Sequence, residues 1–218
     1  MVDKWSRMYA YRSIADWALD GSPVPPPQTV KVLWLDRMRQ AAGSTAFVET
    51  GTLAGTTSAM MSFCDGLAVH TIEIDERQFV RAKEKLAERP NVTQHLGNSA
   101  VILPELVPTL PDRTLFWLDA HCSGDHTGQA ETKSVLTQEV ALLTTDLTRE
   151  FVLVLDDARS FNGRAGYPHL DDLLASLRGL SDTYDARTGH DAVTYAPKSV
   201  WAAFDAAQYS VNSAPFLA

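Results

Sequence analysis

Residues 48–57 read Val-Glu-Thr-Gly-Thr-Leu-Ala-Gly-Thr-Thr, directly after a short apolar run, and they open a helical pattern. A strand that leads through a glycine turn into a helix is typical of the ligand-binding loop in a doubly wound α/β fold. Gly51 and Gly55 would let the backbone turn tightly and come close to a ligand. Glu49 disfavours a pyrophosphate here, because like charges in a semi-buried crevice repel, and it favours a cationic ligand. The P-loop pattern G-x-x-x-x-G-K-[ST] is missing.

On both sides of this loop, short apolar runs alternate with amphipathic stretches. Near-continuous apolar strands separated by helices predict an α/β fold with a doubly wound, mostly parallel sheet covered on both faces. Two late runs flank the turn-like stretch 188–191 and predict an antiparallel terminal hairpin, which makes the sheet seven-stranded. The expected strands are 45–49, 68–74, 92–96, 114–119, 151–156, 183–187 and 192–196, and the expected helices lie near 54–64, 76–89, 99–106, 134–147 and 167–180.

The N-terminal part of the chain has a different pattern. Helical spacing over 3–20 and again over 29–42 is interrupted by the proline-rich stretch 22–28, which cannot continue a helix. We therefore expect a helical extension at residues 1–43 and a main domain at residues 44–218. The aromatic residues of the extension, which are Trp5, Tyr9, Tyr11, Trp17 and Trp34, are expected to pack onto that domain. The role of residues 198–218 is left open.

Composition narrows the class of protein. The 218 residues include 27 acidic and 19 basic side chains, for a net charge of −8, and 45% are hydrophobic. A folded acidic chain without a dense run of Lys and Arg is a poor candidate for binding nucleic acid. Its two cysteines are too few for a disulfide scaffold or a four-thiolate zinc site. No apolar run approaches the ~20 residues that cross a bilayer, and charges interrupt residues 1–20, so we expect a cytoplasmic protein with a small-molecule partner and no membrane partner. A homo-oligomer stays open.

Polar side chains follow the second and third expected strands. Glu73 lies 24 residues after Glu49, where doubly wound folds place an acid that binds ribose hydroxyls. Asp75 is the neighbouring alternative, or else the N-cap of the next helix. Asn98 or Ser99 could hold an adenine edge, and either could instead cap the helix that follows.

In this order on successive strands, Glu49–Gly55, Glu73, Asn98–Ser99 and Asp119 resemble class I S-adenosylmethionine-dependent methyltransferases. The resemblance covers roughly residues 45–160, and the terminal hairpin is similar to that family's antiparallel seventh strand. It implies that the glycine loop approaches the methionine part of the cofactor, that the acid after the second strand binds the ribose, and that the next loop reads adenine. Leu53 stands where the family pattern E/D-x-G-x-G-x-G has its middle glycine. The implied S-adenosylmethionine-binding residues are Glu49, Gly51, Thr52, Gly55, Thr56, Glu73, Asp75, Asn98, Ser99 and Asp119.

Three carboxylates, Asp119 among them, lie at the C-terminal ends of two expected central strands, in Phe116–His121 (FWLDAH) and Val154–Asp157 (VLDD). Asp119, Asp156 and Asp157 would converge at the carboxyl edge of the sheet, where ligands bind in open α/β folds. Without a matching lysine they repel one another unless a cation lies among them. Hard oxygen ligands suit Mg²⁺ best, with Mn²⁺ or Ca²⁺ as alternatives. The structural alternative is that Asp156 or Asp157 only caps a loop or helix.

This trio resembles the metal ligands of O-methyltransferases of the catechol type and of the macrocin type. The resemblance implies that Asp119, Asp156 and Asp157 bind Mg²⁺ and that the metal lowers the pKa of an acceptor hydroxyl on a sugar, natural product or catechol-like molecule. The reaction also requires a base. His121 is the preferred candidate and His126 the second, since an unperturbed imidazole titrates near ~6.5.

Two other enzyme classes fit part of the pattern. An NAD(P)-dependent oxidoreductase would explain Gly51, Gly55 and Glu73, but it leaves the Asp156-Asp157 pair without a use. A metal hydrolase would use Asp119, His121 and the Asp pair, but it leaves the glycine loop unexplained and its D-A-H-x-D spacing is not met. A non-enzymatic sensor of adenosine ligands is disfavoured, because clustered acids are costly to keep without a function.

Overall fold

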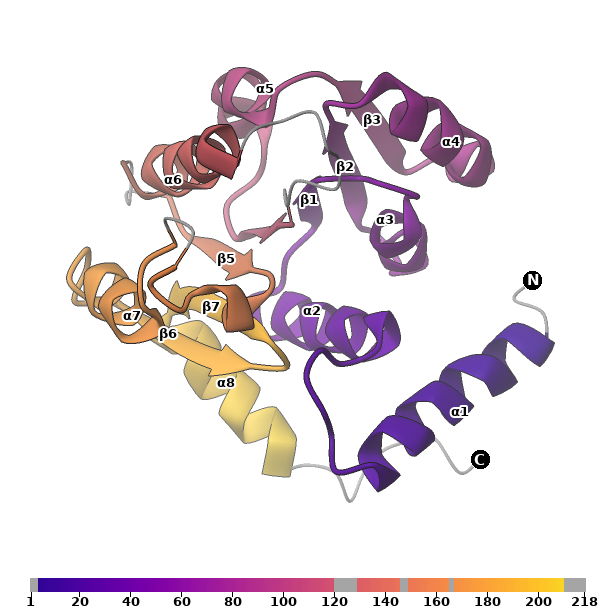
Figure 1. Ribbon diagram of the computed structural model, residues 1–218, viewed down its shortest axis with the longest axis horizontal. Helices are drawn as coiled ribbons and strands as arrows, with labels where there is room; N and C mark the ends of the chain where they lie inside the picture. Colours follow the sequence, from indigo (N-terminus) through magenta and orange to yellow (C-terminus); the bar gives the residue numbers. More distant parts are fainter. Residues whose placement is uncertain (1–3, 120–128, 146–148, 165–166, 210–218) are drawn as a thin grey trace.

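The structure is a computed structural model that describes residues 4–119, 129–145, 149–164 and 167–209. Seven strands form one sheet in the order β3-β2-β1-β4-β5-β7-β6 (Figure 1). β1 to β5 are parallel, while β7 is antiparallel to both β5 and β6. The predicted fold class is confirmed. The strands are β1 Ala46–Thr50, β2 Ala68–Glu73, β3 Val92–Leu96, β4 Thr114–Leu118, β5 Phe151–Leu155, β6 Tyr184–Gly189 and β7 Ala192–Pro197.

Eight α-helices are described: α1 Lys4–Leu19, α2 Gln28–Ala42, α3 Thr56–Met61, α4 Glu76–Leu86, α5 Ser99–Leu106, α6 Gln129–Thr145, α7 Leu170–Arg178 and α8 Lys198–Tyr209. The expected helix over 134–147 begins five residues earlier, and the one over 167–180 is shorter at both ends. None of the described helices is both long and apolar enough to cross a membrane.

The central strands are buried on both faces because their side chains alternate between two hydrophobic cores. Leu115 and Trp117 of β4 point into the core formed with α2, α3 and α8. Phe116 and Leu118 point into the core formed with α5, α6 and α7. Successive strand side chains face opposite sides of a sheet, so one continuous apolar strand serves both layers.

The strand order has a switch point next to β1. The chain runs from β1 outward through β2 to β3 and then returns to the other side of β1 with β4. Ligands bind beyond the carboxyl ends of the strands at such a switch point. The register aligns the strand ends, since Thr50 pairs with Leu118 and Leu118 pairs with Leu155. The residues that follow these strand ends therefore become neighbours.

The two N-terminal helices differ in how they meet the sheet. Leu35 and Met38 of α2 are fully buried in the same core as α8, and the Trp34 indole N–H donates to Thr194 Oγ1 of β7 at 3.1 Å. Figure 1 shows α1 at the margin of the molecule, away from the sheet. The division at residue 43 stays a prediction, but α2 is part of the core that covers the sheet. The side chains of Trp5 and Tyr9 lie outside the described residues.

Gly55 is expected to tolerate no side chain. It has φ +67°, and a Cβ atom there would lie 3.2 Å from Leu86 Cδ1 and 3.3 Å from Ala82 Cβ, both on α4. Gly55→Ala should therefore lower the free energy of unfolding by about 2 kcal/mol, from left-handed strain plus crowding. Urea denaturation measures this loss.

Gly43→Ala is the matched control for Gly55→Ala. Gly43 also has φ +67°, but nothing lies within 4 Å of an added Cβ. Its loss should contain only the strain contribution, about 1 kcal/mol. Equal losses for the two variants would show that the contact with α4 is unimportant.

Candidate active site at the carboxyl edge of the sheet

The glycine loop between β1 and α3 is fixed to the end of β2. The Gly51 N–H donates to the Ile72 carbonyl at 2.9 Å. The Leu53 N–H donates to Glu73 Oε2 at 2.7 Å, and the Asp75 N–H donates to Glu73 Oε1 at 2.9 Å. Glu73 is only 7% exposed. Its carboxylate therefore holds the loop and the strand end in one fixed arrangement at the switch point of the sheet.

Leu53 takes the backbone conformation that glycine usually supplies. Its φ is +48°, in the left-handed region, and its side chain is 46% exposed. The departure from the family's glycine pattern therefore changes the side chain at this position while the loop still makes its left-handed turn.

Glu49 is enclosed in the protein at the end of β1. It is 1% exposed, and its Oε2 accepts hydrogen bonds from Ser58 Oγ at 2.5 Å and from Thr71 Oγ1 at 2.8 Å. Burial raises the pKa of Glu49 to about 7; the two hydroxyl groups oppose this rise, and the nearby charge of Asp119 adds to it. Glu49 ties α3 and β2 to β1. Its predicted attraction of a cationic cofactor stays a prediction.

Two of the predicted binding residues act as helix caps. Asp75 Oδ1 accepts from the N–H groups of Arg77 at 2.8 Å and Gln78 at 3.0 Å, at the start of α4. Asn98 Oδ1 accepts from the Ala100 N–H at 2.9 Å, at the start of α5. The capping interpretation is thus confirmed for both residues.

The two threonines of the loop have different neighbours. Thr52 is buried, and its hydroxyl lies 2.6 Å from that of Thr71. Thr56, at the start of α3, accepts from Lys85 Nζ at 2.8 Å. Thr52 thus joins the network around Glu49, while Thr56 lies on the exposed side of the loop.

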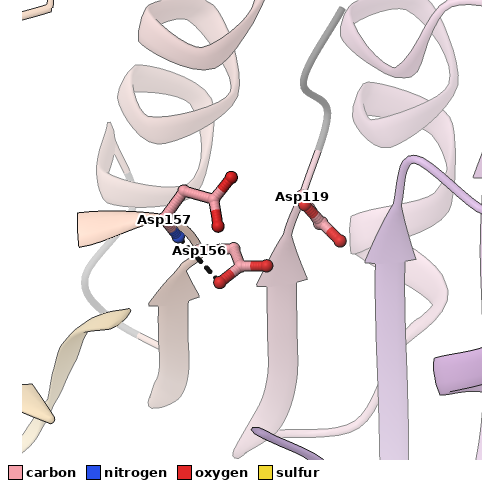
Figure 2. A group of neighbouring side chains, drawn as sticks. All are labelled: Asp119, Asp156 and Asp157. Atoms are coloured by element: carbon pink, nitrogen blue, oxygen red, sulfur yellow. Dashed lines mark hydrogen bonds between the residues drawn. The ribbon is translucent and has the colours of Figure 1, made fainter. Parts of the chain in front are cut away.

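The predicted carboxylate trio comes together. Asp119, Asp156 and Asp157 each offer an oxygen, and these oxygens all lie within 4.8 Å of one another. Figure 2 shows Asp119 after the end of one strand and Asp156 after the end of its neighbour, with Asp157 beside Asp156. The Asp157 N–H donates to Asp156 Oδ1 at 2.7 Å. The aligned strand ends create this cluster, as the sequence predicted.

Lys31 is a residue of this site that the sequence pattern did not predict. From α2, its Nζ lies 2.6 and 2.8 Å from the two oxygens of Asp156 and 3.1 Å from Asp157 Oδ1. The premise that the trio lacks a matching lysine is wrong. Burial by itself would lower the pKa of Lys31, but the hydrogen bonds and charges of Asp156 and Asp157 raise it. Burial and the charge of Asp119 raise the pKa of Asp156, against the effect of Lys31.

The three carboxylates are suitable ligands for a divalent ion, but the Lys31 ammonium already contacts two of them. Three carboxylates are suitable ligands for Mg²⁺, yet both oxygens of Asp156 already bind the Lys31 ammonium. Arg159 adds a second positive charge, with Nη1 at 2.7 Å from Asp157 Oδ1. As arranged here, the trio does not fit a divalent ion.

A second residue that the sequence did not reveal is Glu139 of α6. It is fully buried, and neither carboxyl oxygen has a hydrogen-bond partner among the residues that the structure describes. Burial raises the pKa of Glu139 to about 7, and the nearby hydroxyls of Ser99 and Thr50 only partly oppose the rise. Because Thr50 ends β1 and Ser99 begins α5, Glu139 lies between these two elements.

The predicted base lies in residues 120–128, outside the described part of the chain. This applies to His121, to its alternative His126, and to Cys122. Their roles stay predictions.

Solved structures of methyltransferases share this architecture. TomG, an O-methyltransferase from Streptomyces achromogenes solved in complex with SAM, aligns with a TM-score of 0.56 at 20% identity, over 86% of this chain and 88% of that one. An O-methyltransferase from Bacillus cereus in complex with SAH gives 0.55 at 14% identity, over 86% and 89%. A putative O-methyltransferase from Klebsiella pneumoniae gives 0.59 at 16%, over 86% and 88%.

No family model matches the chain, and no curated protein matches it by sequence. The structural likeness therefore establishes the fold alone: this chain has the fold of these solved O-methyltransferase structures.

Proposed function

We propose that the protein is an S-adenosylmethionine-dependent O-methyltransferase that acts on a hydroxyl group of a small molecule. The observation that carries the proposal is the glycine loop fixed by Glu73 at the switch point of the sheet, next to the carboxylates of the neighbouring strand ends. Open α/β sheets bind ligands at that point. Structures with the same fold have been solved with SAM or SAH.

The cofactor would bind across the ends of β1 and β2. Glu73 would accept hydrogen bonds from the ribose hydroxyls, since its carboxylate is fixed beside the glycine loop by two backbone N–H groups. Gly51 and Gly55 would let the loop lie close to the methionine part. Asn98 and Ser99, at the start of α5, would border the adenine.

The methyl group would then pass from the sulfonium to an acceptor oxygen. The carbon–sulfur bond breaks as the carbon–oxygen bond forms, and the hydroxyl proton goes to a base, for which His121 and His126 are the candidates. Positioning the oxygen in line with the methyl group supplies much of the rate in such a transfer. A sugar, a natural product or a catechol-like acceptor would suit the trio, whose carboxylates accept hydrogen bonds from hydroxyl groups.

The expected requirement for magnesium had its basis in uncompensated carboxylates. Lys31 supplies compensation, so no step of the proposed reaction is assigned to a metal. The requirement for magnesium is thus a prediction from the sequence of the carboxylates alone.

Cofactor binding is the direct test of this proposal. Calorimetry is expected to show S-adenosylmethionine binding with micromolar affinity and no binding of NADH. Glu73→Gln should weaken S-adenosylmethionine binding by about tenfold or more, because a charge-assisted hydrogen bond to the ribose is lost.

Glu105→Gln on the exposed face of α5 is the matched control and should leave the affinity unchanged. A folded protein that binds NADH but not S-adenosylmethionine would instead support the oxidoreductase alternative.

A further inference from the structure

Lys31 is a charged side chain that is almost completely buried. Its side chain is 7% exposed and that of Asp156 is 3% exposed. A lysine is almost never buried unless it is paired, and desolvating an ion pair is costly unless its geometry is good. The ammonium meets that condition, because it contacts three carboxylate oxygens within 3.1 Å.

Both oxygens of Asp156 already contact the Lys31 ammonium. Oδ1 binds Lys31 Nζ at 2.6 Å and the Asp157 N–H at 2.7 Å, while Oδ2 binds Nζ at 2.8 Å. A divalent ion bound to Asp156 would therefore stand within a few ångströms of the ammonium. In a poorly hydrated site, repulsion between a double and a single positive charge at that distance is strong.

The path of the side chain also fixes where the ammonium lies. Lys31 starts from α2, which is anchored by its buried neighbours Val30 and Val32, and its Nζ lies 6.0 Å from the centre of the Trp117 ring. Trp117 is fully buried in β4 and belongs to the core that α2 covers. The packing of α2 against the sheet therefore fixes the position of the Lys31 ammonium.

We propose that Lys31 is a positioning residue that takes the place of the divalent ion in the carboxylate trio. Its ammonium neutralises Asp156 and Asp157 and holds both beside Asp119, so that the protein does not bind a divalent ion there. The consequence for catalysis rests on the proposed function: if the protein is a methyltransferase, methyl transfer would proceed without a metal. The binding of a metal, however, can be measured without knowing the acceptor.

Manganese titration tests the proposal, with the EPR signal of free Mn²⁺ as the readout. The wild-type protein should show no saturable site up to about millimolar Mn²⁺. Lys31→Met should gain one site, and its affinity for Mn²⁺ should exceed that of the wild-type protein by about 100-fold or more. Adding Asp119→Asn to Lys31→Met should remove the new site. Lys31→Arg keeps the charge and should bind no Mn²⁺. The Mn²⁺ site gained by Lys31→Met is the result that a purely structural role for Lys31 would not produce.

Lys83→Met, at an exposed position of α4, is the control and should behave as wild type. A wild-type protein that binds one Mn²⁺ as tightly as Lys31→Met, and loses it on Asp156→Asn, would overturn the proposal.

The wild-type protein provides a test even if Lys31→Met fails to fold. Its melting temperature should be the same in EDTA as in millimolar MgCl₂, because a ligand stabilises a protein only where it binds. A rise with MgCl₂ that Asp156→Asn abolishes would contradict the proposal. Calorimetry with S-adenosylmethionine on the same samples separates the two conclusions: loss of cofactor binding would refute the proposed function and leave the metal result standing.

Discussion

Asp156→Ala is expected to lower the free energy of unfolding by about 3–5 kcal/mol, the loss typical when one partner of a buried ion pair is removed. The variant leaves the Lys31 ammonium 7% exposed with Asp157 as its remaining carboxylate partner at 3.1 Å. Urea denaturation at neutral pH measures the loss. Binding of S-adenosylmethionine should persist, because Asp156 follows β5 and the proposed cofactor crevice lies at β1 and β2.

A double variant separates the unpaired charge from other effects of Asp156→Ala. Lys31→Met combined with Asp156→Ala removes the charge along with its partner and should recover at least about half of the loss. Asp20→Ala, at an exposed position, should leave stability within about 0.5 kcal/mol of wild type. A double variant no more stable than Asp156→Ala would show that the pair does not determine the loss.

Glu139→Gln is expected to stabilise the protein by about 3 kcal/mol at pH 8, with nearly no effect near pH 4.5. The folded-state pKa of about 7 lies above the ordinary value of 4.5. The unfolded chain therefore releases this proton first as the pH rises, and the folded state loses stability between these two values. Glutamine carries no ionisable group, so the variant keeps the stability that the wild-type protein loses as the pH rises.

The stability difference between Glu139→Gln and wild type should thus grow from about pH 4.5 to about pH 7 and then stay constant. Urea denaturation at a series of pH values measures it. Glu105→Gln serves again as the control, since its side chain is exposed, and should show no such trend. A constant difference across the whole range would mean that Glu139 is already ionised in the folded protein at low pH.

Local patterns in the sequence were sufficient for much of this structure. The apolar runs predicted the strands to within one or two residues, because a strand buried on both faces has a continuous apolar sequence. Asp75 and Asn98 could be foreseen as helix caps, since capping depends on residues two or three positions away. Even the convergence of Asp119 with Asp156 followed from the pattern, because parallel strands end at the same edge.

Lys31 could not be placed in the same way. A lysine between Val30 and Val32 in an apolar stretch indicates that a charge is buried. No neighbouring residue in the sequence indicates which carboxylate would pair with it. Asp156 lies 125 residues away. The hypothesis of a metal was therefore reached from the carboxylates alone, with the compensating charge left out.

The fold class, the strand ends and the carboxylates at those ends can be predicted from the residue pattern, since each of these depends on local periodicity and on the direction of parallel strands. Which charges meet depends on how the helices pack. The packing of α2 against the sheet brings Lys31 into the trio, and the packing of α6 buries Glu139 beside Thr50 and Ser99. The physical reason is that the electrostatic energy of a buried group depends on distances and desolvation in three dimensions, and neither is encoded in the spacing along the chain.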